Sequence, residues 1–194
     1  MVIETIGLAT RPLAGQVVCG DSGAYWVTDE RIVLTLADGL GHGPEAARAS
    51  QAAVDAVGAA LHLSCEEILA RCDGVLHTTR GAAQVVVVIE RASGRGTVAC
   101  VGNMRAQLVQ RHGHAWFACT RGIVGAGYRN LDVQSVMLVS GDILLLYSDG
   151  LPEQSIPYER CSDTAVSAED QARELLDTLA HGRDDASVLL YRHG

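Results

Sequence analysis

The stretch that decides the fold is Ile32-Val33-Leu34-Thr35-Leu36-Ala37-Asp38-Gly39-Leu40-Gly41-His42-Gly43. Its apolar run predicts a buried strand that ends at Asp38. The glycine-rich loop that follows leaves the backbone open around this carboxylate, and Pro44 suits the first turn of a helix. Because this arrangement presents an acid to a ligand, we take Asp38 as the centre of a predicted metal site.

A second aspartate is expected to face Asp38. Residues 24–28 and 31–37 read as two strands joined by a tight turn at Asp29-Glu30. Asp21 and Asp38 are equally far from the centre of this turn, so an antiparallel hairpin would place them opposite one another. The alternative is that they are two loop aspartates without a shared role, but glycines flank both.

The remaining pattern predicts an α+β fold in one domain, residues 1–194, made of two antiparallel sheets packed together with helices outside. Further strands are predicted at 2–8, 85–89, 97–101, 107–109, 115–117, 133–139, 143–147 and 186–191. Helices are predicted at 46–61, after the capping box Ser64-x-x-Glu67, and after Ser167-x-x-Asp170. The segments 119–130 and 151–166 read as loops, and we expect both to shape substrate choice.

Two more aspartates repeat the arrangement at Asp38. The apolar strand 143–147 ends in Ser148-Asp149-Gly150, and Asp184 precedes the final strand. If these two strands pair antiparallel, Asp184 lies beside Asp149 at one end of the sheet. Four carboxylates gathered in this way repel one another unless a cation neutralises them.

The composition excludes several kinds of chemistry. All 15 basic residues are arginine, so Schiff-base, phosphate-loop and kinase mechanisms that need a lysine amine are excluded. The net charge is −8 and no run of basic residues is evident, which disfavours a nucleic-acid partner. No apolar run is long enough to span a membrane and no signal-like segment begins the chain, so we expect a cytoplasmic protein.

Six cysteines are scattered without a CxxC pair: Cys19, Cys65, Cys72, Cys100, Cys119 and Cys161. We expect all of them to be reduced and mostly buried, and we expect no zinc site. Carboxylate oxygens without His or Cys favour Mg²⁺ or Mn²⁺ instead. Two such ions can bind a phosphate ester and activate a water for in-line attack on phosphorus.

Several segments occur in an ordered set. They are Gly20-Asp21-Ser22, Asp38-Gly39-Leu40-Gly41-His42-Gly43, Val101-Gly102-Asn103, Gly141-Asp142, Tyr147-Ser148-Asp149-Gly150 and Asp184-Asp185-Ala186-Ser187. This set resembles the motifs of the metal-dependent serine/threonine protein phosphatases of type 2C, in their bacterial sporulation and stress-response branch. The match runs from about residue 15 to the end of the chain.

The resemblance implies an α-β-β-α sandwich with a centre of two Mn²⁺ or Mg²⁺ ions between the sheets. It implies that Asp38 bridges the ions, that the Gly39 carbonyl oxygen binds one, and that Asp149 and Asp184 hold the other. Asp21 belongs to this ligand set or lies directly behind it, and we assign the catalytic role to Asp38 and Asp21. Asp184 is preferred to Asp185 because the first acid of the pair matches the motif.

The resemblance also implies a partner. Phosphorylated STAS-domain scaffold proteins of the stressosome would be the substrates, and their dephosphorylation would reset the general stress response. The motifs begin within twenty residues of the start of the chain, so no N-terminal regulatory domain is expected, and we expect a monomer. Two alternatives are a catalytically inactive binding module of the same fold and a small-molecule phosphohydrolase.

Two positions depart from the animal members of this family. Those members carry a histidine directly after the Asp-Gly, where this chain has Leu40, so the proton donor is His42 or water. They also carry a phosphate-binding arginine five residues before the first aspartate, where this chain has Gln16. Three arginines are candidate substitutes: Arg11, Arg121 and Arg183.

Overall fold

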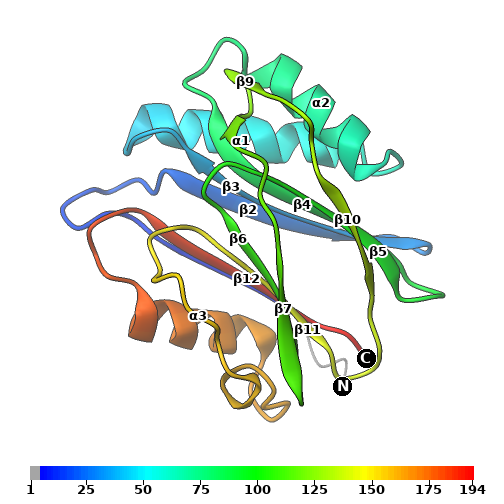
Figure 1. Ribbon diagram of the computed structural model, residues 1–194. Coiled ribbons are helices and arrows are strands. Elements are labelled where there is room, and N and C mark those ends of the chain that lie inside the picture. Colours follow the sequence, from blue (N-terminus) through cyan, green and yellow to red (C-terminus); the bar gives the residue numbers. More distant parts are fainter. Residues whose placement is uncertain (1–4) are drawn as a thin grey trace.

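The computed structural model describes residues 5–194 as two five-stranded antiparallel sheets that pack face to face between helices (Figure 1). The first sheet contains, in spatial order, β1 (Ile6–Arg11), β12 (Ala186–Arg192), β11 (Ile143–Tyr147), β6 (Arg105–Gln110) and β7 (Gly113–Phe117). The second contains β10 (Val133–Met137), β5 (Arg95–Val101), β4 (Ala82–Glu90), β3 (Arg31–Gly39) and β2 (Asp21–Val27). The predicted α-β-β-α sandwich is therefore confirmed.

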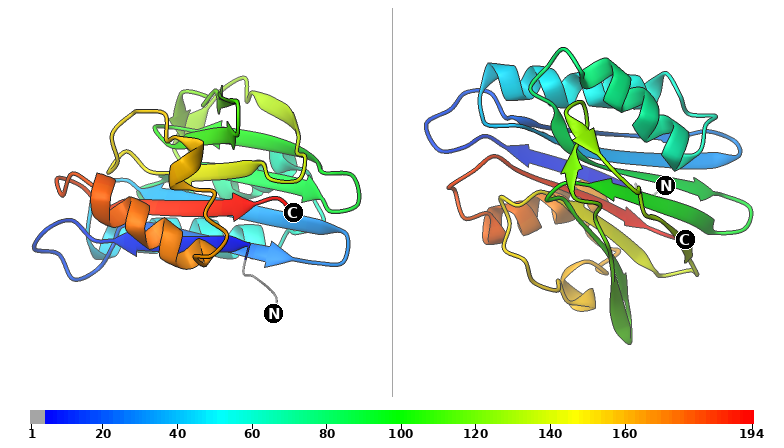
Figure 2. Two further views of the ribbon diagram at one scale, coloured as in Figure 1. Left: turned by 90° about the horizontal axis from the view of Figure 1, so that it is seen from below. Right: turned by 45° about the horizontal axis from the view of Figure 1, so that its top comes forward.

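Three α-helices cover the outer faces of the sheets. Helices α1 (Pro44–Gly58) and α2 (Cys65–Leu76) lie on the second sheet, and α3 (Ala168–Leu179) lies on the first (Figure 2). The predicted capping box at the start of α2 is present, since Ser64 and Glu67 bond each other's backbone N–H groups. No helix in residues 5–194 is long and apolar enough to cross a membrane.

Strand alternation divides the apolar residues between the layers. On β3, Leu34 and Leu36 face the other sheet, whereas Val33 and Ala37 face the helices. A strand covered on both faces reads as a continuous apolar run, which explains the run of five apolar residues at 85–89 in β4. Each fully buried Val or Leu side chain contributes about 1.5–3 kcal/mol to stability.

Some predicted boundaries were wrong. The first strand was predicted for 2–8, but β1 runs to Arg11, and residues 2–4 lie outside the described part of the chain. The segment 119–130, predicted as a loop, contains the short hairpin of β8 (Gly122–Ile123) and β9 (Gly127–Tyr128). The segment 151–166 is a loop apart from the 3₁₀ turn η1 (Tyr158–Arg160).

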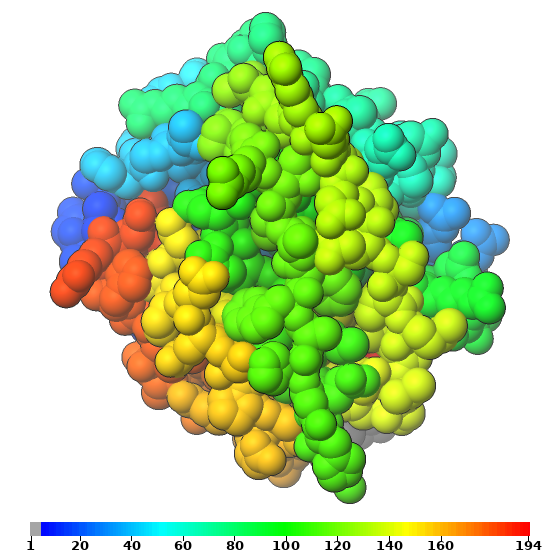
Figure 3. Space-filling model, in the orientation of Figure 1, coloured from blue at the N-terminus to red at the C-terminus, as the bar shows by residue number. Residues whose placement is uncertain are grey.

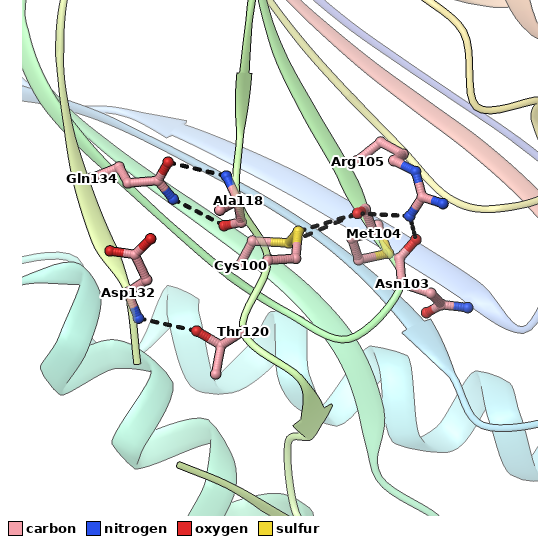
Figure 4. Close-up of a disulfide and its surroundings, with 9 residues drawn as sticks. Cys100, Asn103, Met104, Arg105, Ala118, Thr120, Asp132 and Gln134 are labelled. Atoms are coloured by element: carbon pink, nitrogen blue, oxygen red, sulfur yellow. Dashed lines mark hydrogen bonds between the residues drawn. A yellow bond between two sulfur atoms is a disulfide. The ribbon is translucent and has the colours of Figure 1, made fainter. Parts of the chain in front are cut away.

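The prediction that all six cysteines are reduced was also wrong. Cys100 on β5 and Cys119 form a disulfide with a Cα–Cα distance of 4.5 Å (Figure 4). The two residues are 19 positions apart, and they meet because Val101 and Thr120 form a bridge between the adjacent segments. Spacing alone does not reveal such a pairing. The other four cysteines are free, and three of them are buried.

Candidate metal centre

Asp21 and Asp38 lie opposite one another at the open end of the β2–β3 hairpin. The strand register pairs Asp21 with Asp38 directly, as the equal distances from the turn predict. Asp21 is only 4% exposed, whereas Asp38 is half-buried. Side chains directly opposite in an antiparallel pair have their Cβ atoms about 4.5–5.5 Å apart. The hairpin therefore holds two carboxylates within reach of one ion.

Asp149 and Asp184 reach the same end of the sandwich from the other sheet. Strands β11 and β12 pair antiparallel, with Tyr147 opposite Val188, so the residue that follows β11 lies near the residues that precede β12. The predicted placement of Asp184 near Asp149 is confirmed by a cavity of about 410 Å³ that both residues line together with Asp38.

The carboxylates interact strongly with one another. Burial raises the pKa of Asp38 to about 9, and the charges of Asp21, Asp149, Asp184 and Asp185 add to the effect. Burial likewise raises the pKa of Asp21 to about 6 and raises the pKa of Asp149 above its usual range. A cluster whose members resist ionisation together has a strong electrostatic reason to bind a cation.

Hydrogen bonds orient two of these side chains. Ser187 on β12 donates its hydroxyl to Asp21 Oδ2 at 2.6 Å. Asn103, in the turn after β5, donates Nδ2 to Asp149 Oδ2 at 2.6 Å. Each of these two carboxylates therefore has its Oδ2 atom held by a protein donor.

The set of donor atoms fits a hard divalent cation. Asp21 Oδ1 and Asp185 Oδ2 are buried without a hydrogen-bond partner among the described residues, although buried polar atoms are normally paired. Carboxylate oxygens of this kind favour Mg²⁺ or Mn²⁺. Within residues 5–194, no three His, Cys, Asp or Glu side chains are already arranged around one point as ligands. Water and a backbone carbonyl oxygen would be suitable further ligands for such a cation.

Gly39 is the predicted source of such a carbonyl, and nothing but glycine fits its position. A Cβ atom at residue 39 would lie 2.0 Å from the carbonyl oxygen of Ala46 on α1. The Gly39 N–H donates to the carbonyl of Gly20 at 3.2 Å, which ties the end of β3 to the segment before β2. The backbone next to Asp38 is therefore held by both neighbouring elements.

Comparison with known proteins identifies the family of this chain. The model of the family described as Stage II sporulation protein E (SpoIIE) matches residues 28–194. The chain belongs to the SpoIIE family.

Individual relatives agree with this placement. Phosphoserine phosphatase RsbX of Bacillus subtilis (strain 168) is 27% identical over 138 residues, which are 71% of this chain and 69% of RsbX. A solved chain from a study of the bacterial stressosome, a modular system adapted to control secondary messenger signaling, has a TM-score of 0.92 at 29% identity and covers 97% of this chain and 98% of its own.

The fold of RsbX itself is closely similar. The structure of RsbX in complex with magnesium has a TM-score of 0.84 at 23% identity, and the match covers 96% of this chain and 94% of that one. The resemblance of the sequence motifs to the sporulation and stress-response branch of the type 2C phosphatases is confirmed. This SpoIIE-family chain is a serine/threonine phosphoprotein phosphatase related to RsbX.

The candidate arginines of this SpoIIE-family protein are placed very differently. Arg183 lines the cavity that contains the aspartates. Arg11 instead forms an ion pair with Asp177 on α3, and Arg121 is exposed beside β8. Because only Arg183 lines the cavity, it is the best placed of the three to bind phosphate. His42 also lines the cavity, which is the position that a proton donor requires. Its role as proton donor stays a prediction.

Sequence reasoning missed three residues of this SpoIIE-family site. Asp185 is 2% exposed and accepts a hydrogen bond from the Leu13 N–H at 2.8 Å, so it anchors the segment before β2. Asn103 and Ser187 appeared only as members of motifs, without a role. The signal for them was their position at strand ends next to the aspartates, because residues at the same end of a sandwich lie close together.

Proposed function

We propose that this phosphatase holds two Mn²⁺ or Mg²⁺ ions with Asp21, Asp38, the Gly39 carbonyl oxygen, Asp149 and Asp184. One observation carries the proposal: Asp38, Asp149 and Asp184 line a single cavity, and Asp21 lies opposite Asp38. The magnesium in the similar RsbX structure supports the choice of ion. Asp38 would be the ligand shared by both ions, because burial and the charges of all the neighbouring aspartates raise the pKa of its carboxyl.

The residues around the cavity can divide the work of phosphate ester hydrolysis. Divalent ions bound here would neutralise phosphate oxygens and lower the pKa of the attacking water. Arg183 can donate two parallel hydrogen bonds to the phosphate, a geometry that guanidinium groups favour. His42, or a water molecule, donates the proton that the leaving serine or threonine oxygen needs.

We further propose that the substrates are phosphoserine and phosphothreonine of STAS-domain stressosome proteins in the cytoplasm, so that this enzyme resets the general stress response. The relative RsbX is described as a phosphoserine phosphatase. The similar chain at 29% identity comes from a study of the stressosome. Both observations support a phosphoprotein of this system as the substrate.

The proposal is tested with purified protein, Mn²⁺ and a phosphorylated STAS-domain scaffold protein. We expect phosphate release that EDTA abolishes and that Asp38→Asn reduces about 100-fold or more, because the ion's contribution is worth several kcal/mol. Asp29→Asn is the matched control, since Asp29 is exposed in the turn at the far end of the same hairpin. Unchanged turnover in Asp38→Asn would refute the role of Asp38.

Substrate class is tested separately. The intact phosphoprotein is compared with a short phosphopeptide that carries the same phosphoserine, and with p-nitrophenyl phosphate. A phosphoprotein phosphatase should show a much higher kcat/KM for the intact protein. Equal values for all three substrates would instead indicate a small-molecule phosphohydrolase, and no release from any of them would indicate an inactive binding module.

A further inference from the structure

Charge is distributed very unevenly along this acidic chain. Residues 91–141 contain six of the 15 arginines and only one of the 23 acidic residues, Asp132, a net charge of +5. The rest of the chain, with nine arginines and 22 acidic residues, carries −13. Net positive charge is therefore concentrated in this segment.

The exposed residues of the segment 91–141 lie along one side of the molecule, which we call the basic face. It contains β5 to β10, and Figure 3 shows it, in green to yellow, across the middle of one side of the molecule. Arg95, Arg111, Arg121 and Arg129 are exposed there, and none of them forms an ion pair within residues 5–194. Acidic residues of other segments border the face, since Glu90 lines a cavity with Arg95 and Asp142 lines one with Arg111, but neither forms an ion pair with these arginines.

The basic face also exposes apolar side chains and two sheet edges. Trp116 is 39% exposed, Met137 52% and Val139 58%. Strands β7 and β10 are outer strands of the two sheets, so each has one edge without a paired neighbour among residues 5–194. Exposed Trp, Met and Arg side chains together are typical of protein–protein interfaces.

Several contacts make this surface rigid. The Gln134 side chain on β10 accepts from the Ala118 N–H at 3.0 Å and donates to the Ala118 carbonyl at 2.9 Å. Thr120 Oγ1 accepts from the Asp132 N–H at 3.0 Å (Figure 4). The disulfide of Cys119 lies between these two contacts along the chain. A surface held in one conformation loses little entropy when a partner binds.

The basic face is continuous with the metal centre. Gly102, Asn103 and Ile123 belong to the segment 91–141 and also line the cavity that contains Asp38 and Asp149. A protein bound on the basic face would therefore lie directly beside the place where its phosphoserine has to enter.

We propose that the basic face docks an acidic surface of the phosphoprotein substrate, an inference that rests on the proposed function. Complementary charge accelerates association, and the apolar side chains at the sheet edges add contact area once the partner is bound. Substrate selection thus depends on a surface outside the metal centre, in addition to the phosphoserine itself.

The test compares two triple variants that change the net charge equally. Arg95→Glu/Arg111→Glu/Arg129→Glu alters the basic face. Arg48→Glu/Arg71→Glu/Arg173→Glu is the matched control, and its residues are exposed on α1, α2 and α3. Each protein is assayed with Mn²⁺ on a phosphorylated STAS-domain scaffold protein and on p-nitrophenyl phosphate.

For the basic-face variant we expect kcat/KM on the phosphoprotein to fall about tenfold or more at low ionic strength. Turnover of p-nitrophenyl phosphate should stay unchanged, and high salt should reduce the difference from wild type because it screens exposed charges. The control variant should lose far less. Equal losses in the two variants, or no loss in either, would overturn the inference.

Two further arms separate the remaining explanations. If wild type hydrolyses p-nitrophenyl phosphate but not the STAS-domain protein, the substrate assignment fails. The two triple variants are then compared on phosphorylated casein, an acidic phosphoprotein, in place of the STAS-domain protein. A second arm measures binding of a single-stranded DNA oligonucleotide. The proposal is wrong, and the basic face recognises nucleic acid, if wild type binds the oligonucleotide and the basic-face variant loses this binding but keeps its phosphoprotein turnover.

Discussion

The repulsion around Asp38 predicts that Asp38→Asn stabilises the protein in the absence of metal while it abolishes catalysis. The pKa of Asp38 is raised from 3.8 to about 9 in the folded protein. Between these values the native state keeps a proton that the unfolded chain has released. Unfolding then releases a proton, so the free energy of unfolding falls as the pH rises, by at most about 1.4 kcal/mol for each pH unit.

The size of the effect follows from this slope. Relative to a pH below the unfolded pKa of 3.8, the free energy of unfolding is lower by at most about 2 kcal/mol at pH 5 and by at most about 4 kcal/mol at pH 7. Asp38 is half-buried and solvent screens part of the repulsion, so we expect about 2 kcal/mol at pH 7. Asparagine has nearly the same shape but no charge, and the variant should regain this amount.

The assay is urea unfolding in EDTA at pH 5 and pH 7, followed by circular dichroism. The advantage of Asp38→Asn over wild type should increase between the two pH values, whereas Asp29→Asn should match wild type at both. Mn²⁺ should then stabilise wild type more than the variant, because bound metal removes the same repulsion. A variant that is less stable than wild type in EDTA at pH 7 would refute the electrostatic reasoning.

Two other substitutions test the support of the site. Gly39→Ala should cost about 3 kcal/mol of stability, because its Cβ would lie 2.0 Å from the Ala46 carbonyl oxygen. Thermal unfolding measures this loss, and Gly113→Ala is the control because a Cβ at residue 113 would meet no atom within 4 Å. An equal effect of the two substitutions would contradict the argument. Asn103→Ala removes the 2.6 Å hydrogen bond to Asp149 and should raise the Mn²⁺ concentration for half-maximal activity about tenfold. An unchanged Mn²⁺ titration would show that Asn103 does not orient a ligand.

The paired aspartates could be predicted from the sequence because strand geometry is regular. Once the turn at Asp29-Glu30 is located, the antiparallel register places Asp21 opposite Asp38 without further information. The same rule placed Asp184 beside Asp149 once the last two long strands were assumed to pair antiparallel, whereas the meeting of this pair with Asp38 was implied by the family resemblance. Local pattern therefore suffices wherever a carboxylate is attached directly to a regular strand.

Other features could not be predicted in this way. Asp184 and Asp185 are adjacent, and neighbouring side chains in an extended chain point in opposite directions, so a shift of one residue exchanges their roles. The contact of Asn103 with Asp149 and the disulfide of Cys100 with Cys119 depend on how two sheets and a surface segment meet. The basic face likewise exists only because six short strands bring separate arginines to one side.

The contact between Gly39 and Ala46 limits how this enzyme can diversify. Only residues 40–43 connect β3 to α1, and the strand end and the first turn of the helix already touch. An inserted residue would push α1 away from the sheet and carry the carbonyl of Gly39 with it. Substitutions at 40 and 42 should therefore change the chemistry of this corner at a lower cost in stability than an insertion into residues 40–43.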